Sequence, residues 1–190
     1  MKKLAVLMVL ALELAVCGCG TSSPSTVTTT STTGNWEAEL IGGTDQASEL
    51  NFVTAFNVTD VSGNNESLDI KSFAFFNVGA CFALPVNGVA GSTESGTASF
   101  ATNSGTGQVT GQLTYTVTSI TPPGNILTLT SYQNGLTGTS NGTTTTTGTL
   151  SGGVAVGTWS LTGDSSCTGP VSPVTGTFIM CQGVATCTVP

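Results

Sequence analysis

The sequence predicts an all-β domain in which about nine strands follow one another as an antiparallel meander, closed into a barrel or folded as a sandwich. Apolar and polar residues alternate with a period of two over most of the chain, which is typical of half-buried strands. Clusters of Gly, Asn, Ser and Pro separate the alternating segments, as turns require. Helical periodicity is absent beyond the N-terminal segment, so we expect no helix in the folded part.

Successive strands are expected to be joined by short turns, which makes the predicted topology a meander. The expected strands are 36–41, 50–58, 68–76, 97–102, 108–117, 126–132, 143–150, 154–161 and 174–181. The turn sequences between them are 42–43, 62–65, 87–88, 103–105, 122–125, 134–135, 141–142, 152–153 and 163–164. The bulky side chains expected to meet in one packed core are Phe52, Phe56, Phe75, Leu113, Tyr115 and Trp159.

The N-terminus has the pattern of an export signal. A charged start with Lys2 and Lys3 precedes the apolar run 4–12, and small residues lead to Cys19. The run is too short to span a bilayer, which takes roughly 18 or more apolar residues. A plain secretory signal is one interpretation of this segment.

The segment Val16-Cys17-Gly18-Cys19 resembles the lipobox of bacterial lipoproteins, which are cut before a cysteine that then carries lipid. Cys19 is the better acceptor because Gly18 supplies the small residue before the cut. The resemblance implies a signal peptide at 1–18, an acylated cysteine with a Ser/Thr-rich tether at 19–34, and a single β domain at 35–190. It also implies attachment to a membrane of the bacterial cell envelope through lipid on Cys19. Gly20 after that cysteine resembles the signal for outer-membrane sorting.

The charge inventory excludes several classes of function. The chain has three Lys and Arg residues in all and no His, and removal of the signal would leave Lys71 as the only basic side chain. With no basic patch we expect no nucleic-acid partner. Without His, neither a Ser-His-Asp nor a Cys-His system can form, and the usual catalytic zinc ligands are missing. We therefore predict no catalytic residues, no metal site and no cofactor.

Four cysteines in the expected domain predict disulfides, because the expected export signal would take the protein to a compartment that favours them. Three pairings are possible for four cysteines. A hairpin of 154–161 with 174–181 would place Cys167 at its tip and Cys181 at its open end, too far apart to bond. The sequence therefore favours a Cys81–Cys167 bond and a small Cys181–Cys187 loop that turns at Gly183.

Two Gly-x-Trp sequences occur, Gly34-Asn35-Trp36 and Gly157-Thr158-Trp159. The first resembles the start of the first strand in lipocalin-like calycins, whose barrels hold small apolar ligands. This resemblance implies a candidate ligand site near Trp36, lined by Phe52, Phe56 and Phe75. The alternative is that the tryptophan is a structural plug in the core.

Two further patterns contain acidic residues. The segment 60–69 spaces oxygen ligands as a calcium loop would, but it lacks the EF-hand spacing and is better interpreted as a polar hairpin turn. Glu37 and Glu39 share one face of a strand, as the two carboxylates of a glycosidase could. Most such pairs are the solvated face of an edge strand.

The leading hypothesis is a lipid-anchored protein of the bacterial cell envelope whose β domain serves as a non-enzymatic structural or binding module. One alternative is a carrier of a small apolar ligand in a calycin-like barrel. The other is a glycoside hydrolase that uses carboxylates alone, with two acidic groups about 5–9.5 Å apart across a cleft. The sequence indicates no particular protein or glycan partner.

Overall fold

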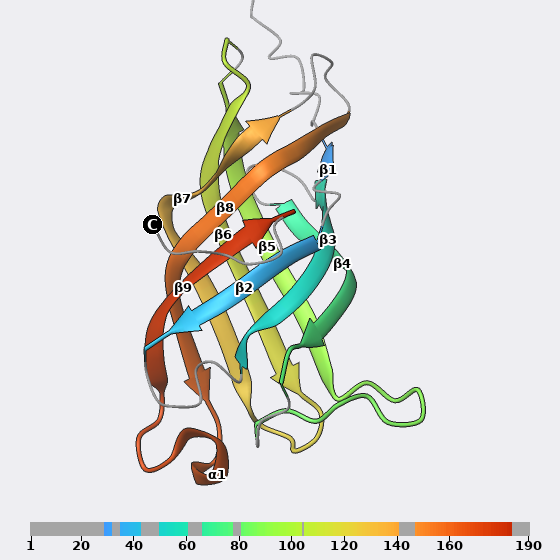
Figure 1. Ribbon diagram of the computed structural model, residues 1–190, viewed down its shortest axis with the longest axis vertical. Helices are drawn as coiled ribbons and strands as arrows, with labels where there is room; N and C mark the ends of the chain where they lie inside the picture. Colours follow the sequence, from blue (N-terminus) through green and yellow to red (C-terminus); the bar gives the residue numbers. More distant parts are fainter. Residues whose placement is uncertain are drawn as a thin grey trace, which may run out of the picture.

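The computed structural model describes residues 29–31, 35–42, 50–60, 66–77, 81–103, 105–140 and 147–183, and it is all-β, as predicted (Figure 1). Cys19 and the expected signal peptide lie outside these ranges. The elements are β1 (Thr29–Ser31), β2 (Asn35–Ile41), β3 (Phe52–Asp60), β4 (Glu66–Phe75), β5 (Ser92–Thr102), β6 (Gln108–Ser119), β7 (Ile126–Ser140), β8 (Thr147–Thr162), α1 (Ser165–Thr168) and β9 (Val174–Gln182).

Strands β2 to β9 form a closed eight-stranded antiparallel barrel. Each strand pairs with the next along the chain, and β9 pairs both with β8 and with β2, which closes the sheet. The barrel alternative is thereby confirmed over the sandwich. β1 pairs in parallel with the first residues of β8, although it lies inside the segment expected to be a tether. Its β-branched threonines suit a strand.

Eight barrel strands replace the expected nine because the predicted turn at 152–153 lies within a single strand, β8, and the predicted turn at 134–135 likewise lies within β7. Gly152 was expected to reverse the chain between 143–150 and 154–161, but β8 runs through it. Its φ of 61° disturbs the ladder with β7 without turning the strand back. Asn134, also at φ 61°, lies within β7 next to a second register shift.

The expectation of no helix was wrong, because the structure contains one short helix. After the turn at 163–164 the chain forms α1, a single helical turn of four residues. Asp164 is its N-cap, and the carboxylate accepts hydrogen bonds from the backbone N–H groups of Ser166 and Cys167.

The barrel has two distinct ends, which we call the α1 end and the β1 end. The α1 end holds α1, residues 81–91 of the connection between β4 and β5, and the turn at 120–125 (Figure 1). The β1 end holds β1 and residues 103 and 105–107, which lie between β5 and β6. β8 connects the two, because its first residues pair with β1 and α1 follows its last residue.

Alternation along the strands places aromatic side chains inside the barrel, as predicted. Phe52 stacks on Tyr115 with ring centroids 5.4 Å apart and approaches Phe73 at 5.0 Å. Of the six predicted core residues, all but the half-buried Phe75 are buried. Because these rings come from β3, β4 and β6, their contacts hold opposite parts of the barrel wall together.

A chain of hydrogen bonds crosses the same interior. The hydroxyl of Thr54 donates to the carbonyl oxygen of Ser72 at 2.9 Å, so its oxygen is left to accept from the hydroxyl of Tyr115 at 2.8 Å. Burial raises the pKa of Tyr115 far above its usual value. The phenol therefore stays protonated and remains a donor, which fixes β6 against β3 and β4.

Replacing Phe56 by Ala should lower the free energy of unfolding by about 3–5 kcal/mol, since it removes a ring that is 3% exposed and stacked on Trp36. Urea denaturation of the full chain measures this loss. Phe76→Ala is the matched control, because Phe76 is 51% exposed and should cost much less. Equal losses in the two variants would show that the interior is not packed around Phe56.

Candidate functional site

The four aromatic residues expected near a ligand, Trp36, Phe52, Phe56 and Phe75, come together in the barrel interior. Trp36 stacks on Phe56 at 5.4 Å with the ring planes 15° apart. Phe75 meets Phe52 edge-on at 6.2 Å. The rings contact one another, which is the arrangement of a packed core.

The indole N–H of Trp36 is the unusual polar feature of this cluster. Its Nε1 is buried and has no hydrogen-bond partner in the part of the chain that the structure describes. By contrast, Nε1 of Trp159 donates to the carbonyl oxygen of Ile41 at 3.2 Å. A buried donor without a partner costs about 1–3 kcal/mol. An acceptor atom of a ligand would remove that cost.

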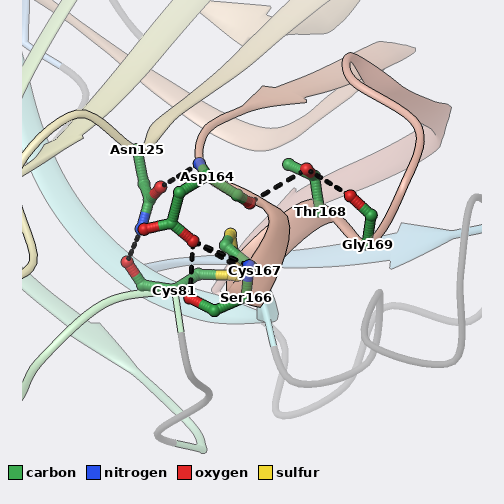
Figure 2. Close-up of a disulfide and its surroundings, with 7 residues drawn as sticks. All are labelled: Cys81, Asn125, Asp164, Ser166, Cys167, Thr168 and Gly169. Carbon is green, nitrogen blue, oxygen red and sulfur yellow. Dashed lines mark hydrogen bonds between the residues drawn. A yellow bond between two sulfur atoms is a disulfide. The ribbon is translucent and has the colours of Figure 1, made fainter.

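Cys81 and Cys167 form a disulfide at the α1 end, as predicted (Figure 2). Their Cα atoms are 4.7 Å apart, and both residues are buried. The bond joins the loop that follows β4 to α1. The β8–β9 hairpin pairs Val154 with Cys181, so Cys167 lies at the tip of the hairpin and Cys181 at its open end.

Asn125 connects the two sides of this disulfide (Figure 2). Its side chain is fully buried, and it donates to the carbonyl oxygen of Cys81 at 2.7 Å and accepts from the backbone N–H of Asp164 at 3.2 Å. Hydrogen bonds from the hydroxyl and backbone N–H of Ser166, and from the backbone N–H of Cys167, hold the pKa of Asp164 below its usual value. These bonds therefore fix three elements to one another: the loop after β4, the turn before β7 and the start of α1. We call this group of elements the base.

The second expected disulfide is only partly covered by the described residues. Cys181 is disulfide-bonded, and Gly183 has a φ of 72°, as the expected turn requires. Cys187 lies outside the described residues, so its pairing with Cys181 stays a prediction.

The acidic candidates do not form an enclosed site. Glu37 and Glu39 share the outer face of β2, since the residues between and beside them point into the core. Burial, and then the charge of Glu39, raise the pKa of Glu37. In the segment 60–69, Asp60 ends β3 and pairs with Glu66, the first residue of β4, and residues 61–65 lie outside the described ranges.

The described residues contain neither a cluster of metal ligands nor a helix suited to cross a membrane. No three His, Cys, Asp or Glu side chains among them gather as a metal ion would require. None of the described helices has the length and apolar character needed to cross a membrane.

The barrel wall is open between β4 and β5. We call this region the β4–β5 seam, and it comprises residues 68–75 of β4 and 92–96 of β5. Among the described residues these two strands pair only at Glu66 with Ala98 and at Ser67 with Thr97. Toward the α1 end, β4 continues to pair with β3, and β5 continues to pair with β6. Within the described part of the chain, each strand therefore has one edge that faces the seam without a partner strand.

Two adjoining recesses occupy the seam. One, of about 160 Å³, is lined mainly by apolar side chains, among them Phe73, Phe75 and Leu84. The other, of about 320 Å³, is shallow and lies between Lys71 on β4 and Glu94 on β5. Glu94 borders both recesses. This pairing of apolar and charged lining is typical of a surface that binds a partner.

Strand patterning in the sequence does not reveal the seam. The sequence feature that could have indicated it is the segment 76–91, which connects two strands and yet is rich in apolar residues. In the structure Leu84, Val86 and Val89 of this loop are all more than half exposed. Only the Asn87-Gly88 turn was predicted there, and it closes the small Val86–Val89 bridge.

Replacing Cys81 and Cys167 together by Ala should lower the free energy of unfolding by about 4–5 kcal/mol, since the bond closes a loop with a sequence separation of 86 residues. Chemical denaturation of the oxidised full chain measures the loss, and peptide mapping confirms the pairing in the parent. A Cys167–Cys181 peptide in the parent would contradict the Cys81–Cys167 pairing. A loss below about 1 kcal/mol would contradict the stabilising role of the bond.

The comparisons with known proteins supply no functional assignment. A scan against protein-family models and searches of curated proteins and of solved structures find no match to this chain. Since one barrel architecture serves many functions, the fold alone does not name an activity. The interior cluster and the β4–β5 seam are therefore the two sites from which a function is inferred.

Proposed function

We propose that this protein is a lipid-anchored component of the bacterial cell envelope whose barrel is a non-enzymatic binding module. The observation that carries the proposal is the contrast between the two sites. The interior aromatic rings contact one another, whereas the seam presents an apolar recess and strand edges that have no partner strand among the described residues. Binding at the wall, supported by a packed interior, is the role that this geometry favours.

The position of the proposed anchor supports a module that faces away from its membrane. Thr29 of β1 follows Cys19 by ten residues, which reach at most about 35 Å when fully extended. β8 runs from the β1 end to the α1 end. Its thirteen residues after Thr149 span roughly 43 Å along the strand. Because strands tilt in a barrel, this corresponds to about 33 Å along the barrel axis. The α1 end and the seam near it would thus point outward, toward other envelope components.

Changing Cys19 to Ser should release the protein from the membrane fraction, because the acyl chains expected on Cys19 would hold it there. Fractionation followed by intact-mass analysis measures both attachment and acyl mass. Cys17→Ser is the matched control and should stay attached. An unacylated N-terminus in the parent, or retention of the Cys19→Ser variant, would overturn the anchor.

The carrier of a small apolar ligand is the second candidate, and the unpartnered N–H of Trp36 favours it. Thermal shift with fatty acids and phospholipids separates the two functions, because a ligand that binds the folded state raises the melting temperature. The binding-module proposal expects no reproducible rise with any of these lipids. A rise that Trp36→Phe abolishes would establish the carrier, since that variant keeps an aromatic ring and removes the donor.

A further inference from the structure

The strand edges at the seam can pair with the backbone donors and acceptors of a partner. Closing a sheet into a barrel normally removes free edges, because every strand has two neighbours. Here, among the residues that the structure describes, 69–75 of β4 pair on one side only, with β3, and 92–96 of β5 pair only with β6. An extended polypeptide satisfies such an edge by adding a strand to it. A bilayer does not, since hydrocarbon offers no hydrogen-bond partners.

The apolar recess at the seam has the size of one side chain. Small-molecule sites usually measure about 300–1,000 Å³ and enclose most of the ligand. The apolar recess beside Phe73, Phe75 and Leu84 measures about 160 Å³, and its neighbour is a shallow surface. Successive side chains on one face of a strand are about 6.6 Å apart, so neighbouring recesses suit alternate residues of an added strand.

Charge at the seam points to a basic residue in that strand. Lys71 is paired with Asp69, and this is the only ion pair among the described residues. Glu94 accepts a hydrogen bond from the hydroxyl of Ser92 at 2.7 Å and forms no ion pair with the described part of the chain. Its carboxylate borders both recesses, so a Lys or Arg of the added strand would pair with it.

The loop beside the seam is held in place, although it exposes apolar side chains. The backbone N–H of Ala83 donates to the carbonyl oxygen of Thr121 at 3.0 Å, and the backbone N–H of Ile120 donates to the carbonyl oxygen of Gly91 at 2.9 Å. A Cβ at Gly91 would lie 1.9 Å from the carbonyl oxygen of Ala83, so only glycine allows this approach. With Cys81 bonded to α1, both ends of the loop are fixed. Exposed aliphatic residues on a fixed loop are typical of a pre-organised interaction surface.

We propose that the β4–β5 seam binds an extended peptide segment of a partner protein, which adds as a strand to the free edge of β4. The segment places an apolar side chain in the recess between Phe73 and Leu84 and a Lys or Arg beside Glu94. This inference rests on the proposed role as a binding module and names its class of partner. It does not depend on acylation of Cys19, so the two are tested separately.

The experiment uses a phage library of random twelve-residue peptides, panned against the immobilised full chain. Enriched sequences should alternate apolar residues and contain a Lys or Arg. Leu84→Asp and Glu94→Gln should each weaken their binding, Leu84→Asp by about tenfold or more. Val171→Asp is the control for Leu84, because Val171 is 66% exposed at the α1 end but lies between α1 and β9. Glu39→Gln on β2 is the control for Glu94, and both controls should bind normally.

Two further measurements establish how the peptide binds. Hydrogen exchange should show new protection at the amides of 69–75, and a version of the enriched peptide with N-methylated backbone should lose its binding. Failure to enrich any peptide, or binding that Leu84→Asp leaves unchanged, would overturn the proposal. Binding to phosphatidylethanolamine vesicles that Leu84→Asp abolishes, with no enriched peptide, would instead assign the surface to a membrane.

Discussion

The pairing of β2 with β9 is the constraint on which the rest of the molecule depends, because it joins the first and last barrel strands and closes the sheet. Closure determines which side chains face inward. Trp36, Ala38 and Leu40 of β2 point into the same space as the rings from β3, β4 and β6. In a barrel of eight strands that space is just wide enough for side chains to fill it. The aromatic contacts and the Tyr115–Thr54–Ser72 hydrogen bonds follow from this confinement.

Closure also makes the β4–β5 seam a local exception rather than a sheet edge along a whole strand. The strands stay joined near the β1 end by the pairing at Glu66 and Ser67, while the packed interior fixes each of them from within. At the α1 end the base built on Cys81, Asn125 and Asp164 holds the loop beside the opening. An opening bordered by fixed elements can bind a partner at a low entropic cost, since little needs to be ordered on binding.

The proposed function assigns different tasks to different parts of the chain. The segment before β1 would connect the barrel to a membrane, the interior would keep the barrel rigid, and the seam would contact a partner. A single Lys in the expected mature chain, Lys71, lies at the seam and is paired with Asp69. Glu94 therefore remains as the charge available to a partner there, which is why the electrostatics favour a basic segment.

The sequence by itself determined the strands, the barrel topology as one of two alternatives, and the Cys81–Cys167 bond, because period-two alternation and hairpin geometry are local properties. Tertiary structure decided what local patterns leave open. Gly152 and Asn134 have turn chemistry, but pairing on both sides made them bulges within β8 and β7. The four predicted aromatic residues do meet, yet only packing shows that they contact one another. The seam arises because β4 and β5 separate beyond Ser67 and Thr97, a property of two strands together that neither segment's sequence contains.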